Sequence, residues 1–166
     1  VDVLIPRGSA DLINSVVAES TVPVIETGAG VVHMYLDDSA DLDQAVAIVH
    51  NSKVQRPSVC NALETLLVSE ASAPRLLPSV LGKLRESGVT IHGDERTREL
   101  FSHALPVTED DWSTEHMSLD LSVRVVAGLD DALEHIRQFS TRHTDAIITN
   151  DLADPDLVER SSQLLD

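Results

Sequence analysis

The chain has 166 residues, 28 of them acidic and 12 basic, and its net charge of −16 argues against a nucleic-acid backbone or an anionic membrane surface as a partner. Its single cysteine excludes a disulfide framework and any zinc site that needs two cysteines. The hydrophobic fraction of 42% is enough for a packed core and no apolar run approaches the ~20 residues of a membrane span, so we expect a cytoplasmic globular protein with a free thiol.

The chain opens on an apolar, strand-like run at residues 1–5. Because chain termini are usually polar and frayed, this opening predicts a piece cut from a longer protein. A helix is predicted next, with Ser9 as its N-cap, because apolar residues recur on one helical face at Leu12, Ile13, Val16 and Val17. Two further strands are predicted around a glycine-rich turn, at residues 22–25 and 31–36.

A second helix is predicted over residues 42–49, capped by residues 37–39, because acidic side chains near its first turn suit the helix dipole. Residues 51–62 show no clean periodicity and contain Pro57, which predicts a loop. Residues 63–68 predict the strand that follows this loop.

The second half of the chain continues to alternate. Pro74 begins a helix with an apolar face, and Gly88 stands where a C′ glycine would end it. The other predicted elements are strands at 89–91, 121–127 and 146–149 and helices at 94–100, 130–140 and 156–165, whereas 106–118 has no clear element. Such alternation predicts an α/β fold with a mostly parallel sheet flanked by helices.

Cys60 is the first candidate for chemistry, because it is the only thiol and lies in the predicted loop. A thiolate nucleophile needs nearby positive charge or oriented N–H groups that lower its pKa. Lys53 and Arg56 are two of only five basic residues in the first half of the chain, residues 1–83. The alternative is that Cys60 is a small buried hydrophobe, and the local sequence leaves both interpretations open.

Gly28-Ala29-Gly30 does not complete a dinucleotide fingerprint, because His33 occupies the place of the third glycine. We interpret it as a turn between strands. Glu26, at the end of the preceding strand, is placed to act as a general base, but most acids near loops are simply solvated. The seven histidines lack the i, i+4 spacing of a zinc site, so we expect no bound metal.

Residues 51–68 read NSKVQRPSVCNALETLLV. This run closely resembles the active-cysteine segment of the γ-glutamyl phosphate reductases, also called glutamate-5-semialdehyde dehydrogenases, within the aldehyde dehydrogenase superfamily. The resemblance extends over nearly the whole chain, more weakly at 89–114, and includes residues 4–8, 22–30, 119–123, 135–137 and 140–148. It implies an aldehyde-dehydrogenase-like catalytic domain.

The activity that this resemblance implies is the NADPH-dependent reduction of L-glutamyl 5-phosphate to L-glutamate 5-semialdehyde and phosphate, a step of proline biosynthesis. Cys60 would attack the acyl phosphate and form a thioester, which accepts hydride far better than a carboxylate does. The partner is then a small anionic substrate, not a nucleic acid or a membrane, and the full-length family members are expected to be homo-oligomers.

The resemblance also assigns roles to other residues. It places Lys53, Gln55, Arg56 and Asn61 at the substrate, and from the anionic groups of that substrate we infer that Arg56 is their clamp. At the NADP(H) cofactor it places Glu115 on the nicotinamide ribose, and Gly8 and Ser9 near the phosphates, although helix capping by Ser9 is an equal alternative. Glu26 matches a water-activating glutamate of oxidising relatives; a reductase needs no such water, so we expect a lesser, structural role.

By the same resemblance, residues 1–24 are the end of a cofactor-binding portion and residues 25–166 a catalytic domain, incomplete at both ends relative to the family and inactive by itself. Two alternatives stay open. One is a non-catalytic α/β interaction or regulatory domain, in which the thiol would react only after unfolding. The other is an acyl-reducing aldehyde dehydrogenase that uses a coenzyme A thioester, against which the cationic pair Lys53 and Arg56 argues.

Overall fold

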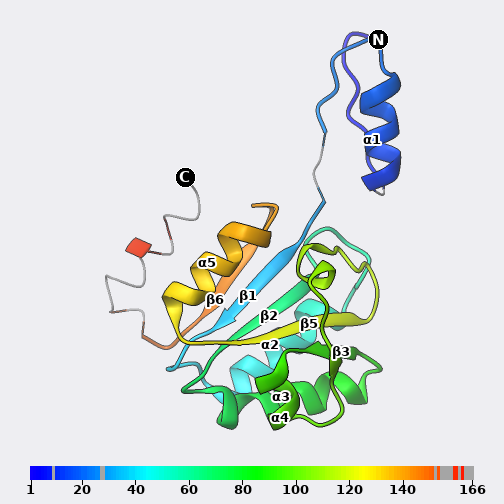
Figure 1. The fold of residues 1–166 in the computed structure, drawn as a ribbon. Helices are drawn as coiled ribbons and strands as arrows, with labels where there is room; N and C mark the ends of the chain where they lie inside the picture. Colours follow the sequence, from blue (N-terminus) through cyan, green and yellow to red (C-terminus); the bar gives the residue numbers. More distant parts are fainter. Residues whose placement is uncertain (9, 27–28, 152, 154–158, 161, 163–166) are drawn as a thin grey trace.

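A parallel six-stranded sheet, in the order β4-β3-β5-β2-β1-β6, organises the part of the chain that the computed structural model describes, namely residues 1–8, 10–26, 29–151, 153, 159–160 and 162 (Figure 1). Its strands are β1 (Val32–Leu36), β2 (Leu63–Ser69), β3 (Thr90–Gly93), β4 (Leu105–Pro106), β5 (Asp120–Val126) and β6 (Asp145–Ile148). The helices are α1 (Ala10–Glu19), α2 (Leu42–Val54), α3 (Ala73–Glu86), α4 (Glu95–Leu100), α5 (Leu129–Phe139) and the 3₁₀ helix η1 (Asp110–Ser113). The predicted α/β fold with a parallel sheet is therefore confirmed.

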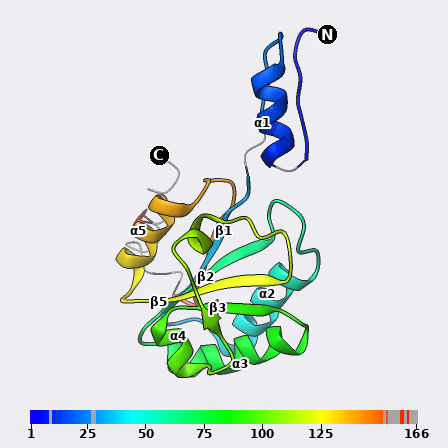
Figure 2. The same ribbon diagram turned by 45° about the vertical axis from the view of Figure 1, so that its right-hand side comes forward.

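The helices cover both faces of the sheet (Figures 1 and 2). The chain moves from β1 through β2 and β3 to β4 in one direction, with α2, α3 and α4 as the connecting helices, and returns from β5 to β6 through α5. Because strand–helix–strand crossovers are right-handed, the two directions place their helices on opposite faces. Alternate residues of β1 accordingly face two cores: Met34 and Leu36 pack with α2 and α3, and Tyr35 packs with α5.

Helix α2 is longer than the sequence predicts, because residues 51–54 belong to it and not to the loop. Its buried positions are Ala45, Val49 and Lys53, spaced four residues apart. The last of them is a lysine, so the apolar periodicity is interrupted where the helix continues. The cap is also different: the carboxylate of Asp41 accepts the N–H of Gln44 at 3.0 Å.

The predicted cap at residues 37–39 instead joins strand ends. The carboxylate of Asp37 accepts the N–H and hydroxyl of Ser39, at 3.2 and 2.8 Å, and the hydroxyl of Thr149 at 3.0 Å. These hydrogen bonds lower the pKa of Asp37, although burial opposes them. The loop after β1 is thereby tied to the end of β6.

Apart from the strands predicted at 1–5 and 22–25, the other predicted elements that lie in the described part are confirmed within two residues, including α3, which begins next to Pro74 and is followed by Gly88 at a φ of 83°. The segment 106–118 contains the short strand β4 and helix η1. The helix predicted at 156–165 lies outside the described residues except for Glu159, Arg160 and Ser162. In the described part, no helix is both long and apolar enough to cross a membrane.

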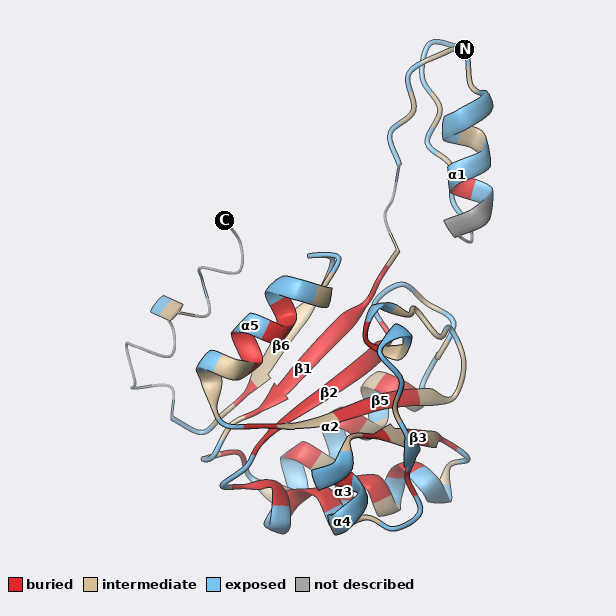
Figure 3. Ribbon diagram, viewed as in Figure 1, coloured by how far each residue is buried: buried red, intermediate tan, exposed pale blue. Residues whose placement is uncertain are grey.

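The N-terminal arm, which we define as residues 1–8 and 10–26, extends away from the sheet in both ribbon views (Figures 1 and 2). The strands predicted at 1–5 and 22–25 reduce to one parallel bridge between Leu4 and Val24. Figure 3 shows that the arm is mostly exposed while β1 and β2 are buried. Its exposed apolar side chains include Val1, Ile5 and Ile25, at 93, 59 and 58%.

Candidate functional site

Three segments that precede parallel strands meet at the amino-terminal edge of the sheet. They are residues 29–31 before β1, residues 55–62 before β2 and residues 114–119 before β5. The N–H of Gly30 donates to Glu115 Oε1 at 2.9 Å, and the N–H of Met117 donates to Glu64 Oε1 at 3.2 Å. We take this convergence as the candidate site, because it contains Cys60.

Cys60 is exposed, in a turn after α2. Two backbone hydrogen bonds close the turn. The N–H of Val59 donates to the carbonyl of Arg56 at 3.4 Å, and the N–H of Ala62 donates to the carbonyl of Val59 at 2.9 Å. Neither the N–H nor the sulfur of Cys60 has a hydrogen-bond partner among the described residues. An exposed thiol beside an unused N–H suits a nucleophile with an oxyanion donor, and the interpretation of Cys60 as a buried hydrophobe is wrong.

Gly30 lies directly against the backbone of Cys60. A Cβ at position 30 would overlap the carbonyl oxygen of Cys60 and lie 2.7 Å from its carbonyl carbon. Close approach of two backbones, and not the phosphate cradle of a nucleotide site, therefore accounts for this glycine. The entry into β1 and the cysteine turn consequently hold each other in place.

Lys53 is fully buried and its ammonium donates to Glu64 Oε2 at 2.8 Å. Burial lowers the pKa of Lys53 and raises that of Glu64, and the mutual attraction of the two charges opposes both shifts. The ammonium is thus bound inside the fold and is not presented to solvent. The predicted substrate contact of Lys53 stays a prediction, and the geometry supports a structural role for it.

The remaining predicted substrate residues, Gln55, Arg56 and Asn61, are all exposed on the Cys60 turn. The guanidinium of Arg56 has no ion-pair or hydrogen-bond partner in the described part of the chain. Of the two cations predicted beside Cys60, Arg56 is therefore the one available to an anionic ligand.

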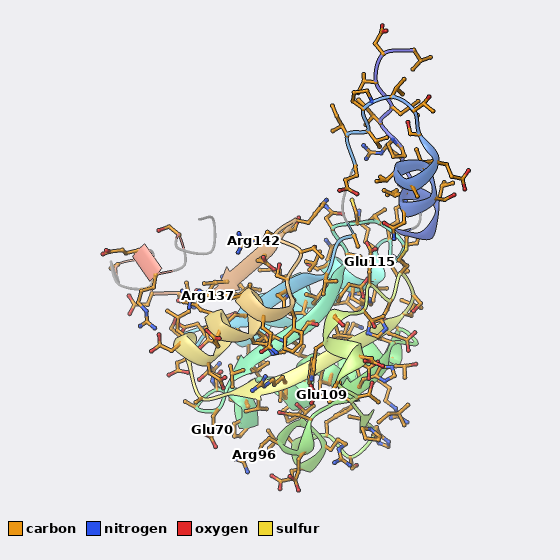
Figure 4. The ribbon with its side chains drawn as sticks, turned by 45° about the horizontal axis from the view of Figure 1, so that its top comes forward. Glu70, Arg96, Glu109, Glu115, Arg137 and Arg142 are labelled. Carbon is orange, nitrogen blue, oxygen red and sulfur yellow. The ribbon has the colours of Figure 1, made fainter. Side chains whose placement is uncertain are left out.

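The predicted cofactor residues are separated. Glu115 lies where the N-terminal arm meets the sheet (Figure 4), and the structure brings it together with Cys60 through Gly30. Gly8 is exposed in the N-terminal arm, and Ser9 lies outside the described residues. Glu26 is exposed at the end of the N-terminal arm, and no hydrogen bond or ion pair joins its side chain to another described residue. Among the described residues, no group of three or more His, Cys, Asp or Glu is arranged to hold a metal ion.

Sequence reasoning did not single out Glu64 or the stacked histidines His92 and His116. His116 stacks on His92 with ring centroids 5.7 Å apart, and His92 Nε2 lies 2.9 Å from Asp120 Oδ1. Burial, then the charge of Lys53, lowers the pKa of His116, and hydrogen bonds from His92 and Ser118 lower that of Asp120. The sequence signal that could have identified Glu64 is that it is the single charged residue of a strand, Leu63–Ser69.

Comparison with known proteins supports the resemblance over most of the chain. No protein-family model matches. The gamma-glutamyl phosphate reductase of Clavibacter michiganensis is 61% identical over 153 residues, which are 92% of this chain and 35% of the relative. The chain thus spans about a third of the length of the curated relatives it matches.

Solved structures agree with this result. The crystal structure of gamma-glutamyl phosphate reductase from Thermotoga maritima superposes with a TM-score of 0.92 at 42% identity, over 99% of this chain and 39% of that one. A propionaldehyde dehydrogenase from Clostridium phytofermentans, only 17% identical, shares the fold with a TM-score of 0.72, over 100% of this chain and 46% of that one. The resemblance to the γ-glutamyl phosphate reductases and the aldehyde-dehydrogenase-like fold are therefore confirmed.

Proposed function

We propose that Cys60 is the nucleophile of an enzyme that reduces L-glutamyl 5-phosphate to L-glutamate 5-semialdehyde and phosphate with NADPH, in proline biosynthesis. The observation that carries the proposal is an exposed cysteine beside an unused N–H, in a turn whose sequence resembles the reductases' active-cysteine segment. The curated relatives with this name support it, as does the oxidoreductase activity that their name states.

The residues of the turn suit the covalent step. The sulfur of Cys60 forms a bond to the acyl carbon, the bond from that carbon to the phosphate oxygen breaks, and phosphate leaves with its electron pair. The N–H of Cys60 stabilises the oxyanion that develops on the acyl oxygen. When bound, NADPH supplies the hydride that reduces the resulting thioester. The carbon–sulfur bond then breaks, and the thiolate is regenerated as the semialdehyde leaves.

The carboxylate of Glu115 has one oxygen available for a cofactor hydroxyl. Its Oε1 accepts from Gly30, and its Oε2 has no hydrogen-bond partner among the described residues. A half-buried carboxylate oxygen of this kind accepts a hydrogen bond from a ribose hydroxyl. NADP(H) as the cofactor, with Gly8 and Ser9 near its phosphates, is part of the proposal.

The proposed substrate is a small molecule with a phosphate and an α-carboxylate. Arg56 is the proposed clamp, since its guanidinium is exposed beside Cys60 and can bind either anion with two hydrogen bonds. Gln55 and Asn61 are proposed as polar contacts on the same turn. A cytoplasmic location and a homo-oligomeric assembly also belong to this proposal.

The test expresses the complete reading frame that encodes these residues, and measures NADP⁺ reduction with glutamate 5-semialdehyde in the presence of phosphate. We expect turnover that requires phosphate, and at least a 10³-fold loss with Cys60→Ser, because a hydroxyl is a far weaker nucleophile at neutral pH. Turnover that needs coenzyme A in place of phosphate would move the assignment to another acyl-reducing aldehyde dehydrogenase.

Thiol labelling separates the proposal from a non-catalytic domain. Iodoacetamide should modify Cys60 of the folded chain rapidly near neutral pH, and glutamate-like anions should slow the reaction. Modification that occurs only in denaturant would contradict an active-site thiolate and favour an interaction or regulatory domain.

A further inference from the structure

Glu64 is an unusual residue for its position. It is the only charged residue of β2, whose residues are all buried. In the pairing of β1 with β2, Val32 lies opposite Leu63 and His33 lies opposite Thr65, so Glu64 is the extra residue of a register irregularity. Such irregularities redirect a side chain and are frequent beside active sites. This one lies three residues after the Cys60–Asn61 turn.

Each carboxylate oxygen of Glu64 contacts a different segment. Oε2 accepts from the ammonium of Lys53, in the last turn of α2, and Oε1 accepts from the N–H of Met117. Met117 has a φ of 54°, a left-handed conformation that residues other than glycine rarely adopt. The hydrogen bond to Glu64 therefore helps to hold this residue, two positions after Glu115, in its unusual backbone conformation.

From Met117 the connection continues to the nucleophile. Glu115 Oε1 accepts the N–H of Gly30, and Gly30 lies against the carbonyl of Cys60. A continuous series of contacts thus runs through Lys53, Glu64, Met117, Glu115, Gly30 and Cys60. It joins all three segments of the candidate site.

We propose that Glu64 is a positioning residue, which keeps Glu115 and Gly30 in register with Cys60 through the N–H of Met117. The inference rests on the proposed function, in which Cys60 is the nucleophile and Glu115 contacts the cofactor. Its specific content is that Glu64 acts as a hydrogen-bond acceptor for Met117 and not only as the counter-charge of Lys53.

Two double variants separate these roles. Lys53→Met/Glu64→Gln and Lys53→Met/Glu64→Leu both remove the buried ion pair, but only glutamine keeps a carbonyl oxygen that can accept from Met117. The readout is amide hydrogen exchange and the ¹⁵N–¹H signals of Met117 and Gly30, with the amide of Leu84 in α3 as a reference for global unfolding. Neither measurement requires turnover, so a failure here is distinct from a failure of the proposed reductase activity.

We expect the leucine variant to raise the exchange rate of the Gly30 amide at least tenfold relative to Leu84, and the glutamine variant to stay within threefold of the parent chain. In the complete enzyme, the leucine variant should also lower kcat at least tenfold relative to the glutamine variant, with the KM for the anionic substrate within threefold. If the leucine variant does not fold, Glu64→Thr replaces it, because threonine suits a strand and is too short to reach Met117. Equal amide exchange rates in the two variants would overturn the proposal. So would an exchange rate at Gly30 that stays the same while the rate at Met117 rises.

Discussion

The carbonyl of Cys60 lies against the Cα of Gly30, in the space that any larger residue at position 30 would need for its Cβ. The oxygen belongs to the backbone of the cysteine turn and cannot rotate away as a flexible side chain would. The identity of residue 30 therefore determines where the turn, and with it the thiol, is held.

Replacement of Gly30 by alanine should displace the cysteine turn and destabilise the chain by about 1–3 kcal/mol, as overpacking does. Gly82→Ala is the matched control, because a Cβ at this helical position meets nothing within 4 Å. There we expect a gain of up to about 1 kcal/mol. Urea unfolding measures both, and equal midpoints for the two variants would contradict the close contact.

The Lys53–Glu64 pair should show strong energetic coupling. Lys53→Met alone leaves a buried carboxylate without a counter-charge, for which we expect a loss of about 3–5 kcal/mol. Lys53→Met/Glu64→Leu removes both charges and should recover most of that loss. A double-mutant cycle in urea checks this, and additive effects of the two substitutions would be inconsistent with a direct pair.

Acid should weaken the fold through His135. Burial first, then the charges of His33 and Arg124, lowers the pKa of His135 from its ordinary 6.5 to about 3. The unfolded chain takes up this proton near pH 6.5 and the folded chain does not, so stability is present above pH 6.5 and falls below it. For this one group, we expect a loss of about 2 kcal/mol between pH 7 and pH 5.

His135→Phe isolates that contribution, because phenylalanine retains the packing against Trp112 and Phe139 but has no titrating nitrogen. Urea unfolding at pH 7 and pH 5 gives the comparison. The variant should lose about 2 kcal/mol less than the parent chain over this interval. If the parent chain and the variant lose the same stability between pH 7 and pH 5, His135 takes up its proton in the folded chain as readily as in the unfolded chain, and the prediction is wrong.

Arg56→Gln should weaken substrate binding with little effect on folding, since the side chain is exposed and unpaired in the described part of the chain. In the complete enzyme, we expect KM for the anionic substrate to rise about 10–100-fold, the usual range for losing charge-assisted hydrogen bonds. The control is Arg96→Gln, which makes the same charge change far from Glu115 of the candidate site (Figure 4). Arg96 pairs there with Glu70 at 3.1 Å. A similar KM for both variants would argue against a clamp at position 56.

The sheet and most of its helices could be predicted from periodicity, because their buried positions are apolar and regularly spaced. Prediction was wrong where the buried residue is charged. Lys53 occupies a core position of α2, where the apolar pattern would require a hydrophobic residue, so the last turn of the helix was not predicted. Nothing in the sequence shows that Glu64 neutralises this lysine. In the N-terminal arm, the apolar runs at 1–5 and 22–25 indicate strands, but only one bridge forms between them.

The location of the site was open to prediction only in part. The motif singles out Cys60 as the candidate nucleophile, but it does not show that Gly30 lies against it, because this contact depends on β1 and β2 being neighbours. Ligands of open α/β sheets usually bind at the carboxyl ends of strands. Here Cys60, Gly30 and Glu115 all precede their strands, so the general rule points to the opposite edge.

The pairing of β1 with β6 has a consequence for the order of folding. It joins His33 to Asp145 across 112 positions, whereas β1 and β2 are brought together by the single helix α2. Contacts between distant parts of a chain form slowly, so β6 is expected to add to a sheet that already contains β1 and β2. Until it does, β1 is an edge strand with unpaired backbone groups, open to association with other chains. Aggregation during synthesis should therefore depend on how quickly β6 pairs with β1.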